Sequence, residues 1–221
     1  MNKDMKYDAV IFDLDGTLTD TLKSIWKSAN LALSDVGLPP FEIDRYRYFV
    51  GDGAAELVKR ALVANGDTEL VHLDEMAESY RKYFEKYVNY EVKPYEGIPE
   101  LLNALKEKGL LLAVNSNKPQ ERTVNVVEKN FGKGTFDILV GQSDERARKP
   151  APDGVFYIME QLGLVREEVI YLGDTCVDMK TGKSAGVYTV GALWGFRDRQ
   201  ELEENHADAI IEHPMELLNY L

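Results

Sequence analysis

The sequence lacks several features that would place it in a particular class of protein. It contains a single cysteine, Cys176, which excludes an internal disulfide and favours a reducing cytoplasm. The longest apolar stretch, near residues 110–114, is far shorter than the roughly 20 residues needed to span a membrane. The three histidines, His72, His206 and His213, do not have the spacing of a zinc site. We therefore expect a cytoplasmic protein that has no membrane partner.

Positive charge is also scarce in this chain. Lysine and arginine total 26 against 38 aspartates and glutamates, so the formal net charge is −12. Such a charge disfavours nucleic acid and anionic membranes as partners. It does not exclude a small phosphorylated substrate, because a metal ion and a few local cations can reverse the potential inside one cleft.

The second part of the chain alternates helical and strand-like segments. Apolar runs predict strands at 110–115, 136–140, 169–173, 187–193 and 209–211. Helical patterns separate them at 97–108, 119–130, 152–162 and 175–185, and a helix is expected at the C-terminus. This alternation predicts an α/β fold with a doubly wound, Rossmann-like parallel sheet of five or six strands. Functional groups of such a sheet lie at the carboxyl ends of its strands.

Residues 19–91 differ from the rest of the chain because they lack strand-like runs. Helical stretches are predicted there at 20–36, 54–65 and 73–90, and the last carries an aromatic stripe that favours packing within a helical bundle: Tyr80, Tyr83, Phe84 and Tyr87. The simplest organisation is an α-helical cap, residues 19–91, inserted into a core formed by residues 1–18 and 92–221.

The strongest local signal follows the apolar segment 7–12. It is Asp13-Leu14-Asp15-Gly16-Thr17, in which two carboxylates precede a glycine turn. Side chains two residues apart on a strand point to the same side, so Asp13 and Asp15 are expected to converge. Clustered carboxylates repel one another unless a cation or a shared proton lies between them, and Mg²⁺ is the cation that best suits oxygen ligands. The Thr17 hydroxyl can stabilise the turn.

Three further motifs follow this one along the chain, each at or just beyond a predicted strand end. They are Asn115-Ser116-Asn117-Lys118, Arg148-Lys149-Pro150-Ala151-Pro152-Asp153 and Gly173-Asp174-Thr175-Cys176-Val177-Asp178. Together with Asp13-Leu14-Asp15-Gly16-Thr17, this ordered set resembles the haloacid dehalogenase superfamily of phosphohydrolases. The resemblance extends over nearly the whole chain. An α-helical cap between the first and second motifs is a feature of that family.

This resemblance implies chemistry for the carboxylates. Asp13 is the candidate nucleophile, forming an aspartyl-phosphate, and Asp15 is the candidate general acid and base. Mg²⁺ is expected to be held by Asp13, the backbone carbonyl of Asp15 and Asp174. Asp178, one helical turn after Asp174, is expected to order metal-bound waters rather than bind the metal directly.

The resemblance also assigns roles to two residues that spacing alone would leave unassigned. Ser116 would donate a hydrogen bond to a phosphoryl oxygen, and Lys149 would neutralise the charge of the phosphate and the nucleophile. Without the family pattern, Ser116 would be interpreted as a helix-capping residue and Lys149 as a solvated loop lysine. Thr17 and Asn117 are further candidate substrate-binding residues.

Within the predicted cap, residues 46–62 resemble the cap segment of phosphoglycolate phosphatases. Gly51 and Gly53 would allow a tight loop, followed by a helix N-terminus at Ala54 that can attract an anion. Arg60 on that helix could face a substrate carboxylate. The alternative is a simple turn between helices, with Arg60 facing solvent.

The resulting prediction is a Mg²⁺-dependent phosphatase that acts on a small phosphorylated metabolite, with phosphoglycolate as the favoured substrate and a monomer or homodimer as the assembly. A pyrophosphatase and a β-phosphoglucomutase-like sugar phosphomutase are the alternatives within this fold. Asp15 argues against the dehalogenase and phosphonate-cleaving branches, which the resemblance indicates lack an aspartate there. A non-catalytic protein is disfavoured because all four motif residues are present: Asp13, Asp15, Lys149 and Asp174.

Overall fold

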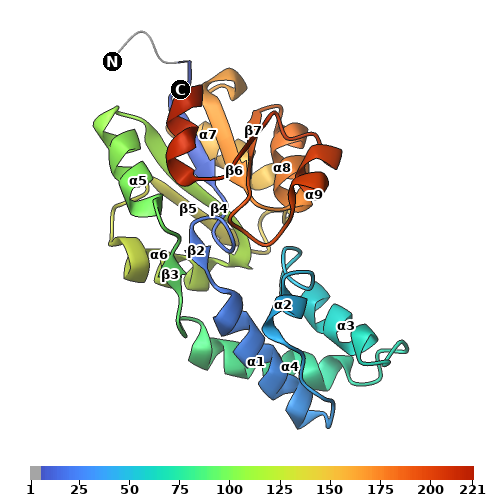
Figure 1. The fold of residues 1–221 in the computed structure, drawn as a ribbon. Coiled ribbons are helices and arrows are strands. Elements are labelled where there is room, and N and C mark those ends of the chain that lie inside the picture. Colours follow the sequence, from blue (N-terminus) through green and yellow to red (C-terminus); the bar gives the residue numbers. More distant parts are fainter. Residues whose placement is uncertain (1–5) are drawn as a thin grey trace. The chain divides into compact units, whose positions relative to one another are not determined.

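The computed structural model describes residues 6–221, and the chain divides into two compact units (Figure 1). The first, called here the core unit, combines residues 6–20 with 94–221. The second, the helical unit, comprises residues 21–93. Two short strands, β2 (Thr19–Asp20) and β3 (Lys93–Pro94), pair where the chain passes from one unit to the other. The helical unit thus begins at residue 21 and ends at residue 93, whereas the sequence predicted a cap from residue 19 to residue 91.

A parallel sheet forms the centre of the core unit, with the strand order β5-β4-β1-β6-β7-β8. The first strand therefore lies inside the sheet, and the chain winds outward in both directions from it, which confirms the predicted doubly wound topology. Within the described residues, the six strands of this sheet are β1 (Ala9–Phe12), β4 (Leu111–Pro119), β5 (Ile138–Gln142), β6 (Val169–Gly173), β7 (Tyr188–Ala192) and β8 (Ala209–Ile211).

Helices cover both faces of this sheet, as the fully buried side chains of β1, which point alternately to the two faces, illustrate. Ile11 joins a buried cluster with Val155 and Ile158 of α7 (Asp153–Leu162). Phe12 points to the other face and makes an edge-to-face contact with Phe136. A strand covered on both faces is almost continuously apolar, which is why the sequence showed short hydrophobic runs there. The other core helices are α5 (Ile98–Glu107), α6 (Gln120–Phe131), α8 (Cys176–Ala185) and α9 (Arg199–Glu204).

Some elements differ from the sequence-based expectation. The strand predicted to end at residue 115 continues to Pro119, with a register shift against β5 between Asn115 and Pro119. The short helix α9 was not predicted; the Asp198 side chain caps it by accepting a hydrogen bond from the Glu201 N–H. The expected C-terminal helix is a 3₁₀ segment, η2 (Pro214–Tyr220), and another 3₁₀ turn, η1 (Arg166–Glu168), precedes β6.

The helical unit contains α1 (Leu22–Asp35), α2 (Ile43–Tyr46), α3 (Ala54–Ala64) and α4 (Leu73–Tyr87). The long helices α1 and α4 pack against each other (Figure 1). Of the aromatic stripe on α4, Tyr80 and Phe84 are buried, and their rings stack with centroids 5.4 Å apart. Tyr83 lies at the edge, where its hydroxyl donates to Asp35. Within residues 6–221, no helix has the combined length and hydrophobicity that crossing a membrane would require.

Candidate active site

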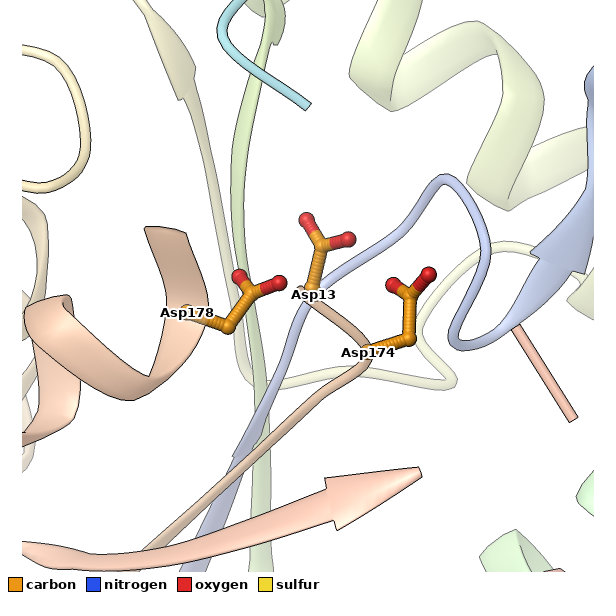
Figure 2. Close-up of side chains that lie close together, drawn as sticks. All are labelled: Asp13, Asp174 and Asp178. Carbon is orange, nitrogen blue, oxygen red and sulfur yellow. The ribbon is translucent and has the colours of Figure 1, made fainter. Parts of the chain in front are cut away.

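Three aspartates face one another at the carboxyl edge of the core sheet (Figure 2). Asp13 follows β1, Asp174 follows β6, and Asp178 lies in the first turn of α8. Because β1 and β6 are adjacent strands and α8 begins directly after β6, the fold brings the three side chains together. Each offers a carboxylate oxygen within 4.8 Å of the others, and all three residues are buried. We call these three residues the acidic cluster.

Lys149, in the loop between β5 and α7, joins this cluster as its cation. Its ammonium group donates to Asp13 Oδ1 at 2.6 Å and to Asp178 Oδ1 at 2.7 Å, and its side chain is only 4% exposed. Three carboxylates and one ammonium leave two negative charges when all are ionised. A divalent cation with a preference for oxygen ligands would balance this charge, so the residues fit Mg²⁺.

Burial controls the protonation of the cluster in the absence of a cation. It raises the pKa of Asp13 well above the usual carboxyl value; Lys149 opposes the change, whereas Asp178 and Asp174 reinforce it. Burial, and then Asp178, raise the pKa of Asp174 to about 7. Burial alone would lower the pKa of Lys149, but the Asp13 and Asp178 carboxylates outweigh it and raise that pKa well above its usual value. Lys149 therefore stays protonated, and the raised pKa values of Asp13 and Asp174 favour protons on these two carboxyls that a cation would displace.

Asp15 lies outside the acidic cluster. Its two carboxylate oxygens accept hydrogen bonds of 2.7 and 2.6 Å from the ammonium group of Lys118. β1 ends at Phe12 and the chain turns at Gly16, which has a φ of +98°, and Asp15 is not among the three carboxylates that lie within 4.8 Å of one another; the convergence of Asp13 and Asp15 stays a prediction. Lys118 is the last residue of the motif Asn115-Ser116-Asn117-Lys118, but no role could be predicted for it, because the sequence does not distinguish a buried lysine from a solvated one.

The second motif runs along the end of β4, and its side chains are buried. Ser116 does not cap α6, because its hydroxyl oxygen accepts a hydrogen bond from the Lys118 N–H at 3.2 Å and the helix has no side-chain cap. The Asn117 amide donates to the Lys149 carbonyl at 3.1 Å. Ser116, Asn117 and Lys149 line the same small cavity, so three of the predicted site residues come together there.

Thr17, for which substrate binding stays a prediction, contacts the acidic cluster. It is fully buried, and its hydroxyl donates to Asp174 Oδ1 at 2.9 Å. The observed contact therefore connects the turn after β1 with a member of the acidic cluster. Nothing in the spacing of the sequence could indicate this pair, because the two residues are 157 positions apart.

The remaining predicted residues belong to the helical unit. Gly51 and Gly53 adopt positive φ values of 115° and 87°, and α3 begins directly after them at Ala54. The Arg60 guanidinium donates to the Phe49 carbonyl at 3.1 Å and forms an ion pair with Asp52. Arg60 is thus held by the loop that precedes its own helix. A role for these residues in substrate binding stays a prediction.

Comparisons with known proteins agree on one family. The family model of haloacid dehalogenase-like hydrolases matches residues 10–192. The phosphoglycolate phosphatase of Aquifex aeolicus is 35% identical over 213 residues, covering 96% of this chain and 95% of that protein. The N-acetylmuramic acid 6-phosphate phosphatase of Pseudomonas aeruginosa is 30% identical and covers 99% and 96%. A crystal structure from Lactobacillus delbrueckii subsp. bulgaricus superposes with a TM-score of 0.92 at 30% identity and covers 98% and 99%.

Proposed function

The chain belongs to the haloacid dehalogenase-like hydrolase family, and we propose that it is a Mg²⁺-dependent phosphatase acting through an aspartyl-phosphate, with phosphoglycolate as its preferred substrate. The family and the relatives named as phosphatases make the chain a phosphoric monoester hydrolase. The observation that carries the mechanistic proposal is the buried cluster of Asp13, Asp174 and Asp178 with the ammonium group of Lys149 among them.

Asp13 acts as the nucleophile in this proposal. One of its carboxylate oxygens forms a bond to phosphorus while the bond from phosphorus to the leaving oxygen breaks. Lys149, whose ammonium group lies 2.6 Å from Asp13 Oδ1, orients the carboxylate and offsets the negative charge that accumulates beside it. Ser116 and Asn117, which line a cavity with Lys149, are proposed to bind the phosphoryl oxygens.

Asp15 transfers the protons. As a carboxylic acid it gives a proton to the leaving oxygen; as a carboxylate it then accepts one from the water that attacks phosphorus and releases Asp13. Its side chain is 22% exposed, whereas that of Asp13 is 8% exposed, so Asp15 is the more accessible to a leaving group and to water. We propose that the buried ammonium of Lys118 holds Asp15 in this position through its two hydrogen bonds.

The proposed Mg²⁺ ligands are Asp13, Asp174 and the backbone carbonyl of Asp15. When bound, Mg²⁺ would neutralise the charge of the phosphoryl oxygens and help to align them. Asp178 is proposed to order water at the metal instead of binding it, and its own oxygens accept hydrogen bonds within the core unit. These come from Lys149 at Oδ1 and from the Thr175 hydroxyl, at 2.7 Å, at Oδ2.

The substrate proposal depends on the relatives. Phosphoglycolate is favoured by the Aquifex aeolicus protein, and N-acetylmuramic acid 6-phosphate is a second candidate because its phosphatase matches 99% of this chain. Both compounds carry a carboxylate besides the phosphate, so we propose that a cationic side chain distinguishes them from phosphate esters without a carboxylate. Arg60, with the loop at Gly51 and Gly53, is the candidate in the helical unit.

A panel of substrates tests the proposal. Phosphate release should be measured from phosphoglycolate, N-acetylmuramic acid 6-phosphate, pyrophosphate and β-glucose 1-phosphate, with Mg²⁺ and with EDTA. We expect the highest kcat/KM for phosphoglycolate, loss of activity in EDTA and recovery on adding Mg²⁺. Conversion of β-glucose 1-phosphate to glucose 6-phosphate would support the phosphomutase instead. A preference for pyrophosphate would overturn the substrate assignment but not the proposed chemistry of phosphoryl transfer. Full activity in EDTA would contradict the proposed metal requirement.

Two further proposals concern the cellular location and the oligomeric state of the protein. The single Cys176 favours a reducing compartment, so we propose a cytoplasmic location. The assembly is proposed to be a monomer or a homodimer. Light scattering coupled to size-exclusion chromatography would decide between the two by mass.

A further inference from the structure

Asp174 is held between two turns of the core unit. It follows β6, and the strands on either side of β6 in the sheet are β1 and β7. The turn after β1 contains Gly16 and Thr17, and the turn after β7 contains Trp194, Gly195 and Phe196. The strand order thus places the turns that follow β1 and β7 next to the Asp174 carboxylate.

Both oxygens of Asp174 accept hydrogen bonds from these turns. The Thr17 hydroxyl donates to Oδ1 at 2.9 Å, and the Phe196 N–H donates to Oδ2 at 2.7 Å. Trp194 supports the first of these bonds, because its indole N–H donates to the Thr17 carbonyl at 2.9 Å. With one donor on each oxygen, the carboxylate cannot rotate freely, and lone pairs remain available for a cation.

Two glycines allow the turns to approach Asp174 so closely. A Cβ atom added to Gly195 would lie 2.3 Å from the Cβ of Asp174 and 2.4 Å from its Oδ2. A Cβ atom on Gly16 would lie 2.3 Å from the same Oδ2 and 2.7 Å from the ring of Phe196. Since real Cβ atoms are not found at such distances, either substitution would displace the carboxylate or the turn.

We propose that the turn after β7 is a positioning element for the metal site, in which Trp194 acts through Thr17, and Phe196 acts directly, to orient Asp174 for the cation. The inference relies on the metal of the proposed function, but it adds Trp194 and Phe196, to which the sequence motifs gave no role, and a positioning role for Thr17. Oriented ligands increase metal affinity because less conformational freedom is lost on binding.

The affinity for Mg²⁺, measured by isothermal titration calorimetry, tests this proposal without an activity assay. Thr17→Val removes the hydroxyl and keeps the shape of the side chain, and we expect Kd to rise about tenfold, as for other groups that orient a metal ligand. Thr17→Ser keeps the hydroxyl and should restore most of the affinity. Trp194→Phe, which removes only the indole N–H and part of the ring, should raise Kd by a smaller factor. Gly195→Ala should raise it at least as much as Thr17→Val.

Trp26 provides a matched control in the helical unit. Its indole N–H also donates to a backbone carbonyl, that of Phe41, at 3.0 Å. Trp26→Phe therefore loses the same kind of hydrogen bond and should leave the Kd for Mg²⁺ unchanged. Circular dichroism and thermal unfolding of each variant would show that the fold is retained.

Wild-type affinity in both Thr17→Val and Trp194→Phe would overturn the positioning role. An equal loss in Trp26→Phe would also overturn it, because the effect would then be one of general stability. A wild-type protein that binds no Mg²⁺ would overturn this inference and the metal of the proposed function together. A protein that binds Mg²⁺ with these differences but hydrolyses no phosphate ester would support the inference and reject only the proposed activity.

Discussion

The core unit contains ion pairs that are much more deeply buried than those of the helical unit. In the core unit, the side chains of Lys149 and Asp178 are 4% and 2% exposed, and that of Lys118 is 2% exposed where it binds Asp15. In the helical unit, Lys23 and Glu91 are 51% and 46% exposed, and Arg60 and Asp52 are 36% and 29% exposed. The same chemical groups are therefore desolvated at the candidate active site and partly exposed in the helical unit, whereas other pairs of the core unit, such as Arg199 with Glu212, are exposed as well.

This difference has consequences for what each pair can do. An exposed pair contributes at most about 1 kcal/mol and can exchange its partner at little cost. Removing one member of a buried pair leaves an uncompensated charge, which costs about 3–5 kcal/mol. The core unit is thus suited to chemistry that demands one fixed arrangement, and the helical unit to contacts that a substrate can replace. The predictions that follow test this division.

The largest effect is expected for the nucleophile. Asp13→Asn replaces the carboxylate with a neutral amide that is neither nucleophile nor anionic ligand, so turnover should fall by more than about a thousandfold. Steady-state phosphate release measures the loss. Asp44→Asn, at an exposed position of the helical unit, is the control and should behave as wild type. Near-normal activity of Asp13→Asn would exclude the covalent route.

Substitutions in the buried pair of Asp15 and Lys118 are expected to cause a smaller loss of kcat/KM, and its size should depend on the leaving group. Lys118→Met should lower kcat/KM by about a hundredfold for an alkyl phosphate, and less for p-nitrophenyl phosphate, whose leaving group needs no proton. Asp15→Asn should show the same dependence. Lys23→Met removes an exposed lysine that pairs with Glu91 and serves as the control. Equal losses of Lys118→Met on both substrates would contradict a role through Asp15.

The pH dependence of metal binding should follow the raised pKa of Asp174. Because this pKa is about 7 in the metal-free protein, protons compete with Mg²⁺ below pH 7, and Kd should rise up to about tenfold per pH unit as the pH falls. Calorimetry at several pH values measures this. A Kd that does not vary between pH 5.5 and 8 would contradict the buried, proton-holding cluster.

The same pKa determines the sign of a stability change. Burial raises it above the value of an unfolded aspartate, so the metal-free protein is stabilised at low pH and loses this contribution as the pH rises toward 7. Added Mg²⁺ should restore Tm most strongly above pH 7. Thermal unfolding with EDTA and with Mg²⁺ gives the comparison.

The smallest effect is expected in the helical unit. Arg60→Ala should lower kcat/KM for phosphoglycolate by about five- to tenfold, and that for p-nitrophenyl phosphate by less, because only the former has a carboxylate to bind. Lys59→Ala removes a neighbouring cation of α3 that pairs with Glu56, and it should not discriminate between the substrates. Equal losses of Arg60→Ala on both substrates would show that Arg60 does not bind the carboxylate.

Much of the fold was predictable because its signals are local. The apolar run at 169–173 coincides with β6, and the glycine at 163 ends α7 as expected. Predicted element boundaries were wrong where a tertiary contact extends an element. An example is β4, which continues to Pro119 because it pairs with β5. The short helices α2 and α9 were missed because four or six residues carry too little periodicity to be recognised.

The sequence by itself determined the parallel α/β fold, the family and the residues that gather at the carboxyl edge of the sheet, because strand patterns and motif order are written along the chain. Only the tertiary structure decided how these residues pair. It joined Asp15 to Lys118, and it placed Thr17 and the turn after β7 against Asp174. These pairings join residues that are far apart in the chain, and they depend on strand order and burial, which determine the neighbours and the charge state of each group.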